Sequence, residues 1–280
     1  MSTSSKRTTA AEKTTALFGR HQALVGMIHV GALPGTPRHQ QSIDELLIAA
    51  ARDANTLSEA GFDALIVENM HDVPYLRRDV GPEIVASMSV IARAIRETID
   101  LPLGVQVLAG ANQAALAVAQ AADCTFIRAE GFSYASVADE GILDEADAGN
   151  LLRYRRKISA ESIAILADVC KKHSAHAITS DVSFEDHVDT LAFMGADGVV
   201  VTGTATGHPV DYDELAVATN ACDLPIIAGS GANAESIATL LENADAVIVG
   251  SSAKENGHWS RPVDAANAER VVTEARRAHP

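Results

Sequence analysis

The chain has 280 residues, of which 47% are apolar and only 4% aromatic, a composition typical of a large aliphatic core. Its 37 acidic residues outweigh 22 Lys and Arg residues, giving a formal net charge of −15. This balance argues against binding to nucleic acid, because phosphate backbones are bound by clustered cations. An acidic chain with few lysines fits either adaptation to high salt or an ordinary acidic enzyme.

Residues 1–20 contain no apolar stretch of signal-peptide length, and no later run approaches the length of a membrane span. We therefore expect a flexible N-terminal tail over residues 1–20, one domain over residues 21–280 and no direct insertion into a membrane. Cys124, Cys170 and Cys222 lie far apart and form no CxxC pair. This spacing argues against a disulfide framework and fits a reducing cytoplasm.

From Leu24 onward, short apolar runs alternate with longer amphipathic ones. Crossovers of this length require parallel strands, so the pattern favours one closed (β/α)8 TIM-type barrel, with an open doubly wound sheet as the alternative. Such barrels often form homo-oligomers, but no interface is identifiable from the sequence. The candidate strands are residues 24–30, 64–69, 103–108, 126–130, 163–169, 198–203, 225–231 and 246–252.

Polar side chains stand at the ends of nearly all of these strands, where the active sites of such barrels lie. Each group taken alone is as well explained by capping or by a satisfied core position, whereas the repetition predicts a functional site. In chain order they are His29, Glu68, Asn69, Gln106, Arg128, Glu130, Asp168, Thr202, Ser230, Ser251 and Ser252.

Glycine- and serine-rich turns follow the last two strands, the pair that often forms a phosphate site in this fold. Glycines let the backbone approach an anion, and a helix beginning near Asn233 would direct free N–H groups toward it. Lys254 would supply a full positive charge, unless it is a solvated cation and the glycines serve only tight turns. The predicted phosphate-binding residues are Gly229, Ser230, Gly231, Gly250, Ser251, Ser252 and Lys254.

The segment ADVCKKHS, residues 167–174, places a carboxylate at a strand end beside several cations. Asp168 is a candidate general base or metal ligand, and Lys172 or His173 is suited to steer an anion or transfer a proton. Lys171 is equally well explained as a flanking surface charge. Glu68 is the second candidate carboxylate, and the two together would suit Mg²⁺ or Mn²⁺, although no cofactor is diagnosed.

Three connections have the composition of functional loops. Residues 201–211 form a Gly/Thr-rich turn that is suited to bind a sugar or phosphate through Thr202, Gly203 and Thr204. Residues 31–42 are rich in Gly and Pro, and residues 131–146 exceed the usual loop length. Both of these longer segments are candidates for a lid over the barrel mouth, or for solvent-facing excursions.

Seven motifs in order resemble the BtpA family, also called the BtpA/SgcQ family. They are MIHVGALPGTPR (27–38), ENMHDVPYLRRDVGPEIVASMSVIARAIR (68–96), LLRYRRKI (151–158), ADVCKKH (167–173), VVTGTATGHPVD (200–211), GSGANAES (229–236) and VGSSAKENGHWSRPVD (249–264). The resemblance covers almost all of residues 24–273. It implies a TIM-type barrel related to phosphate-binding barrels, with members described either as photosystem I biogenesis factors or as sugar- or nucleoside-processing enzymes.

The resemblance also marks individual positions, and it shows departures. Ala109, Gly110 and Ala111 stand where the family usually has an Arg-Asn-Asp run, and Glu130 stands where it usually has Asn. The resemblance implies that these changes alter the substrate preference or abolish the family's reaction, while the predicted phosphate-binding residues are kept. The marked residues present here are His29, Glu68, Asn69, Arg128, Asp168, Lys172, His173, Thr202, Gly203, Gly229, Ser230, Gly231, Gly250 and Lys254.

The sequence therefore predicts a cytoplasmic enzyme that acts on a small phosphorylated metabolite, either a sugar phosphate or a nucleoside-derived compound. Lyase or aldolase, isomerase and hydrolase chemistry all remain open, and Lys172 as a Schiff-base nucleophile would favour an aldolase. The alternative is a non-catalytic photosystem I or membrane-complex biogenesis factor. The predicted catalytic residues are Glu68, Asp168, Lys172 and His29, and the predicted substrate-binding residues are Asn69, Arg128, Glu130, His173, Thr202, Gly203 and Thr204.

Overall fold

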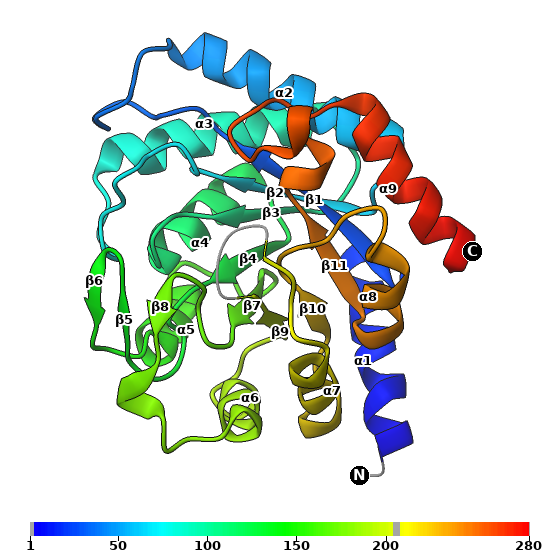
Figure 1. Ribbon diagram of the computed structural model, residues 1–280. Coiled ribbons are helices and arrows are strands. Elements are labelled where there is room, and N and C mark those ends of the chain that lie inside the picture. The colour runs from blue at the N-terminus through cyan, green and yellow to red at the C-terminus, as the bar shows by residue number, and fades with distance from the viewer. Residues whose placement is uncertain (1–2, 204–207, 280) are drawn as a thin grey trace.

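The computed structural model describes residues 3–203 and 208–279 and contains a closed barrel of parallel strands (Figure 1). Around the ring, the order within the described residues is β1-β11-β10-β9-β7-β4-β3-β2. The pairing of β1 with β11 closes the sheet, so the (β/α)8 barrel is confirmed and the open doubly wound alternative is wrong. The strands are β1 (Ala23–His29), β2 (Ala64–Glu68), β3 (Leu103–Gln106), β4 (Phe126–Ala129), β7 (Ala164–Asp168), β9 (Gly198–Val201), β10 (Ile226–Ala228) and β11 (Ala246–Val249).

Helices surround the barrel and connect successive strands (Figure 1). The first of them, α2, begins with a capping box in which Ser42 Oγ accepts from Glu45 N and the Glu45 carboxylate accepts from Ser42 N. It ends at Gly61, whose left-handed φ of 96° suits glycine. The helices are α2 (Ile43–Ala60), α3 (Pro82–Thr98), α4 (Asn112–Ala122), α5 (Ala148–Lys157), α6 (Phe184–Phe193), α7 (Tyr212–Ala221), α8 (Ile237–Asn243) and α9 (Ala265–Ala278), with short 3-10 turns η1 (Ala177–Thr179), η2 (Ser251–Ala253) and η3 (Glu255–Gly257).

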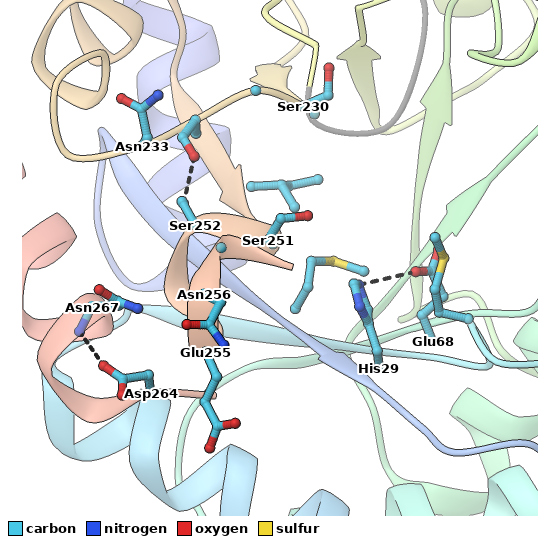
Figure 2. Close-up of a pocket in the computed structure, with 18 of the residues that line it drawn as sticks. His29, Glu68, Ser230, Asn233, Ser251, Ser252, Glu255, Asn256, Asp264 and Asn267 are labelled. Carbon is cyan, nitrogen blue, oxygen red and sulfur yellow. Dashed lines mark hydrogen bonds and ion pairs between the residues drawn. The ribbon is translucent and has the colours of Figure 1, made fainter. Parts of the chain in front are cut away.

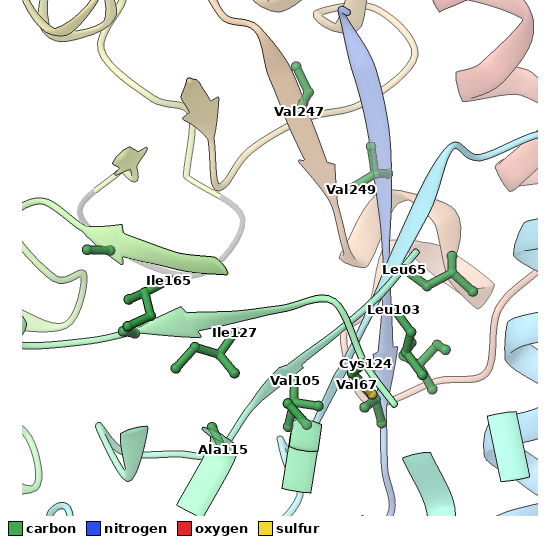
Figure 3. Close-up of a cluster of buried hydrophobic side chains, with 14 of the residues drawn as sticks. Leu65, Val67, Leu103, Val105, Ala115, Cys124, Ile127, Ile165, Val247 and Val249 are labelled. Atoms are coloured by element: carbon green, nitrogen blue, oxygen red, sulfur yellow. The ribbon is translucent and has the colours of Figure 1, made fainter. Parts of the chain in front are cut away.

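The core has two layers, because successive side chains of a strand point to opposite faces. Outward-facing residues such as Leu65, Val67 and Val105 pack under the helices (Figure 3). Inward-facing residues such as Ile66 and Phe126 fill the barrel centre. Gly104 makes room for the Phe126 ring, since a Cβ at residue 104 would lie 2.2 Å from that ring.

Residues 3–18 form a helix, α1 (Thr3–Phe18), where the sequence predicted a loose tail. Phe18, at its end, is only 2% exposed and joins the inner layer of the barrel, where its ring centroid lies 5.4 Å from that of Phe126 in an edge-to-face contact. Ala10 and Thr14 are also buried. The prediction failed because this helix is polar overall, and its buried stripe consists of one residue per turn.

The two long connections are partly ordered by the rest of the fold. Residues 131–146 contain a hairpin of β5 (Ser136–Ala138) and β6 (Gly141–Leu143), and β5 also pairs with β8 (Ser174–Ala175) in an antiparallel three-stranded sheet. In residues 31–42, Leu33 is fully buried and its main-chain N–H donates to Asp72 Oδ1 at 2.8 Å. Neither segment is therefore a simple solvent-facing excursion, and closure over the mouth stays a prediction.

We expect Phe18→Ala to lower the free energy of unfolding by about 3 to 5 kcal/mol, because it removes a large side chain from the inner layer of the barrel. Urea unfolding followed by circular dichroism measures this change. Phe193→Ala is the matched control, since Phe193 is 87% exposed and its truncation should leave the midpoint nearly unchanged. Equal midpoints for the wild type and Phe18→Ala would show that α1 does not stabilise the barrel.

Candidate active site

A cavity of about 830 Å³ lies at the carboxyl ends of the strands. It brings together strand-end residues with the two glycine-rich turns (Figure 2). A cavity of this size suits a small-molecule ligand. The predicted residues that line it are His29, Glu68, Arg128, Lys172, Gly229, Ser230, Gly231, Gly250, Ser251 and Ser252.

One end of the cavity is formed by the turns after β10 and β11. Ser230 Oγ accepts from Gly203 N at 2.7 Å and donates to the His208 carbonyl at 2.9 Å, so its hydroxyl holds two loops together. Gly231 has a φ of +71°, and a Cβ there would lie 2.4 Å from Pro209 Cα. Glycine is therefore required at residue 231 by both backbone conformation and space.

The main chain of these turns offers hydrogen-bond donors to the cavity. Among the described residues, no acceptor is recorded for the N–H groups of Gly231, Ala232, Ser251 and Ser252. Both turns line the same cavity, and main-chain N–H groups without a partner bind anions in other proteins. The donors do not come from a helix beginning near Asn233, as the sequence predicted: α8 begins at Ile237, and Asn233 Oδ1 accepts from Glu235 N and Ser236 N.

The other end of the cavity holds a contact between His29 and Glu68, which end β1 and β2 and face inward (Figure 2). His29 Nδ1 lies 2.7 Å from the Trp259 carbonyl oxygen. A carbonyl only accepts, so Nδ1 carries a proton and Nε2 is the nitrogen facing Glu68 Oε2, at 3.5 Å. The pair is therefore either an imidazolium with a carboxylate or a neutral imidazole with a protonated Glu68.

Burial favours the neutral pair. Desolvation lowers the pKa of His29 well below its usual value, and the positive charge of Lys254 lowers it further. Desolvation also raises the pKa of Glu68, against the opposing charges of Lys172 and Arg128. Both shifts act in the direction of a neutral pair, so the Glu68 carboxyl group is a candidate general acid.

Lys172 follows β7 and lines the same end of the cavity. Burial and the neighbouring Arg128 charge lower the pKa of its ammonium, although Glu68 and Asp168 oppose that change. No ion pair with Lys172 is formed within the part of the chain that the structure describes. A lysine of lowered pKa without a fixed partner is suited to act as a base or a nucleophile.

Asp168 has a different role from the predicted one. Both of its oxygens accept from Arg128, at 2.8 Å from Nε and 3.0 Å from Nη2, and both side chains are buried. A carboxylate engaged in this bidentate pair is not free to act as a general base or to hold a metal. Across residues 3–203 and 208–279, no group of three or more His, Cys, Asp or Glu side chains could hold a metal ion. We therefore assign Asp168 the task of orienting Arg128, which lines the cavity.

Lys254 does not line the cavity, so its placement does not support the predicted contact with phosphate. Its side chain is fully buried, and within the described residues its Nζ has no hydrogen-bond partner. The sequence could not indicate this, because the η2 turn decides which way residue 254 points. Desolvation lowers the pKa of Lys254 to about 8, although the negative charges of Asp53 and Glu68 oppose the change.

The remaining predicted substrate-binding residues lie outside the cavity lining formed by the described residues. Asn69 ties β2 to the next connections, because its Oδ1 accepts from Leu108 N at 2.7 Å and its Nδ2 donates to Asp72 at 2.7 Å. Glu130 is buried 3.8 Å from Lys171 Nζ. The others are His173, which is exposed, Thr202 and Gly203, which belong to the β9 end, and Thr204, which lies outside the described residues.

Sequence reasoning missed two sets of residues. Lys171 is not a surface charge: it is buried and its Nζ donates to Glu140 Oε1 at 2.6 Å, which links the β5–β6 hairpin to the end of β7. The second set lines the cavity beyond the glycine-rich turns and consists of Glu255, Asn256, Asp264, Asn267 and Arg270. These residues come from η3, from the N-cap of α9 and from α9 itself, where strand-end reasoning does not apply.

The fold and the cavity define a (β/α)8-barrel protein whose polar site lies at the carboxyl face of the barrel. The BtpA family model matches residues 20–277, and the chain belongs to this family. An uncharacterized mitochondrial protein of Caenorhabditis elegans is 43% identical over 88% of this chain and 90% of its own length. The Synechocystis photosystem I biogenesis protein BtpA is 34% identical over 88% of this chain and 85% of its own length.

Solved structures share the fold at low sequence identity. (S)-3-O-geranylgeranylglyceryl phosphate synthase from Thermoplasma acidophilum, in complex with sn-glycerol-1-phosphate, has a TM-score of 0.60 at 15% identity and covers 95% of this chain and 98% of its own. N-(5′-phosphoribosyl)anthranilate isomerase from Pyrococcus furiosus has a TM-score of 0.53 at 13% identity and covers 92% and 100%. Within the described residues, no helix is long and apolar enough to cross a bilayer.

We expect Lys254→Met to stabilise the protein by about 3 kcal/mol at pH 7, because it removes a buried ammonium whose pKa of about 8 lies well below that of an exposed lysine. Between about pH 8 and 10.4 the unfolded chain binds more protons than the native one at this residue, so the wild type recovers stability as pH rises. The advantage of the variant should therefore shrink over that range. Thermal unfolding from pH 7 to 10.5 tests this, and a destabilised variant at pH 7 would contradict it.

We expect nitrogen-resolved NMR at pH 7 to show His29 as the neutral Nδ1–H tautomer, because burial disfavours the imidazolium. Glu68→Gln should keep His29 neutral, since the amide can donate to Nε2 in place of the carboxyl proton. An imidazolium at residue 29 at pH 7 would refute the placement of the proton on Glu68.

Proposed function

We propose that this protein is a cytoplasmic enzyme that holds a small metabolite by its phosphate group and acts on it by proton transfer. The observation that carries the proposal is the juxtaposition of two sites in one cavity. Main-chain N–H groups without a hydrogen-bond partner among the described residues lie at the ends of β10 and β11. The Glu68–His29 pair with Lys172 lies at the ends of β1, β2 and β7.

The proposed phosphate site depends on main-chain N–H donors rather than on a fixed cation. Main-chain N–H groups in tight turns bind phosphate without a side-chain charge. Glycine at residue 231 lets the turn after β10 pack directly against the main chain of His208 and Pro209. Lys254 is buried and does not line the cavity, so it supplies no contact there.

The end of the cavity that holds Glu68, His29 and Lys172 supports lyase, aldolase or isomerase chemistry better than glycoside hydrolysis. Protonated Glu68 is suited to donate a proton to a carbonyl or hydroxyl oxygen, while Lys172 is suited to remove a proton or to form a Schiff base. Glycoside hydrolysis ordinarily needs two free carboxyl groups flanking the bond. Asp168, which the sequence offered as the second carboxylate, is engaged by Arg128.

A second function is favoured by one specific observation, the name of the Synechocystis relative. A non-catalytic factor in assembly of a membrane complex would need a surface for its partner and would not need the protonation pattern of Glu68 and His29. Co-sedimentation with membranes that survives Glu68→Gln, together with no stabilisation by phosphorylated ligands, would favour this function over the enzyme.

We expect inorganic phosphate and ribose 5-phosphate at about 100 times their Kd to stabilise the wild type by about 2.7 kcal/mol, because both bind the native state alone. Ser251→Asp should abolish this stabilisation, since it places a negative charge among the donors of the phosphate turns. Thermal-shift titrations at low and molar salt measure the effect.

Asn55→Asp provides the matched control, because it adds the same charge on the exposed face of α2. That variant should respond to phosphate like the wild type. The proposal fails if a correctly folded wild type is not stabilised by any phosphorylated ligand, or if Ser251→Asp and Asn55→Asp respond equally. Glu68→Gln should keep phosphate binding and lose turnover of any substrate found in the screen.

A further inference from the structure

Residues 255–262, between η2 and α9, form a loop that is closed at its base. Lys254 and Val263 pair in an antiparallel bridge on either side of the loop. Glu255 N donates to the Pro262 carbonyl at 3.0 Å directly above that bridge. We call residues 255–262 the strap, because both of its ends are held together next to the barrel mouth.

The strap begins with a tight turn. Asn256 and Gly257 both have left-handed backbone, with φ of 56° and 65°. Across them, His258 N donates to the Glu255 carbonyl at 3.3 Å. Asn-Gly is the sequence that tolerates two consecutive left-handed residues at least cost, so this conformation is encoded locally. The strap therefore has its own hydrogen bonds and a defined shape.

The strap belongs to the candidate site in two ways. Glu255, Asn256 and Gly257 line the cavity (Figure 2). Trp259 is not among the described residues that line it, but its carbonyl oxygen lies 2.7 Å from His29 Nδ1. Any effect of Trp259 on a ligand must therefore act through His29.

The Trp259 ring holds its own carbonyl group in place. Its centroid lies 5.1 Å from that of His71 and 5.7 Å from that of His258. His71 is anchored in turn, because its Nδ1 lies 2.7 Å from the Val30 carbonyl oxygen just beyond β1. Ring contacts at these separations are attractive, so they fix the main chain of residue 259 relative to the end of β1. The acceptor that faces His29 is thereby fixed as well.

This acceptor determines which nitrogen of a neutral His29 carries the proton. A neutral imidazole has one N–H group, and donation from Nδ1 to the Trp259 carbonyl leaves Nε2 as an acceptor. Nε2 faces Glu68 Oε2 at 3.5 Å. Two acceptors that face each other repel, whereas a protonated Glu68 carboxyl group donates to Nε2. The contact with Trp259 therefore favours the acid form of Glu68.

Loss of that contact would permit a different arrangement. His29 could then carry its proton on Nε2 and donate to an ionised Glu68. In this change one proton leaves Glu68 for water, and the imidazole exchanges its Nδ1 proton for one on Nε2 through water. The same two side chains would then present a carboxylate in place of an acid.

We propose that Trp259 is a positioning residue that keeps Glu68 in its acid form by holding a carbonyl acceptor on His29 Nδ1. The inference rests on the proposed function, because it takes protonated Glu68 as the group that donates a proton to the ligand. It adds the strap, which no strand-end pattern includes, to the machinery that prepares this acid.

The test locates the proton of His29 by nitrogen-resolved NMR at pH 7, on the full chain with Trp259→Ala. We expect the ratio of the Nδ1–H to the Nε2–H tautomer to fall at least about tenfold from the wild type, as for loss of one hydrogen bond. Infrared difference spectra against matching Glu68→Gln variants should show a protonated carboxyl group at residue 68 in the wild type and a carboxylate in Trp259→Ala. Trp259→Phe keeps a ring against His71 and should retain the wild-type tautomer.

Phe193→Ala is the matched control, since it removes an aromatic side chain that is 87% exposed and lies on α6. It should leave the His29 signals unchanged. Trp259→Ala alters none of the charged side chains around the pair, so a change in tautomer reports the Trp259 contact. Those side chains are Arg128, Asp168, Lys172 and Lys254 around Glu68, and His71, Lys172 and Lys254 around His29.

If Trp259→Ala does not fold, as judged by circular dichroism, His71→Ala tests the same contact from its other side and should give the same fall. An unchanged tautomer ratio in the folded variant would overturn the inference, as would an equal fall in Phe193→Ala or a carboxylate at residue 68 in the wild type.

Thermal-shift titration with ribose 5-phosphate separates this inference from the proposed function. If the sugar phosphate stabilises the wild type but the tautomer does not respond to Trp259→Ala, the role of Trp259 falls and the phosphate-anchored enzyme stands. If the tautomer responds but no phosphorylated ligand stabilises the protein, the control of Glu68 by Trp259 stands and the proposed function falls.

Discussion

Closure of the sheet by the pairing of β1 with β11 determines where the functional side chains lie. In a closed barrel each second residue of a strand faces the interior, so the inner series of β2 runs Ala64, Ile66 and Glu68. Its apolar members fill the centre, and its polar last member reaches the mouth. The same alternation brings His29 and Arg128 to the mouth from β1 and β4, and strands far apart in the chain thereby contribute to one cavity.

The protonation of the side chains at the barrel mouth depends on burial as much as on ion pairing. Arg128 and Asp168 form a complete bidentate pair, whereas burial lowers the pKa of His29 and raises the pKa of Glu68, which disfavours two charges at that contact. Lys172 lines the cavity with a lowered pKa. Keeping such groups out of water costs stability, and this cost is characteristic of sites whose protonation states serve chemistry.

The residues in which this chain departs from the usual family pattern take on structural tasks. Glu130 adds a carboxylate near the mouth, but this group lies 3.8 Å from Lys171 Nζ and outside the cavity lining. Lys171 in turn contacts Glu140 of the β5–β6 hairpin. The added charge therefore belongs to the cluster that joins the hairpin to the barrel.

The sequence by itself determined the strands, their parallel arrangement and the polar residue that ends each one, because apolar periodicity and strand-end chemistry are local properties of the chain. It also indicated the glycine- and serine-rich turns that line the cavity, since glycine and serine after a buried strand are a local signal. Only the tertiary structure decided which side chains are free to contact a ligand and which are engaged by other residues. Asp168 is engaged by Arg128, 40 positions away, and Lys254 turns inward away from the cavity. Helix α1 was missed, and so were the residues from η3 and α9 that line the cavity. Their positions depend on packing against strands that are distant in sequence, and no local sequence pattern indicates such contacts.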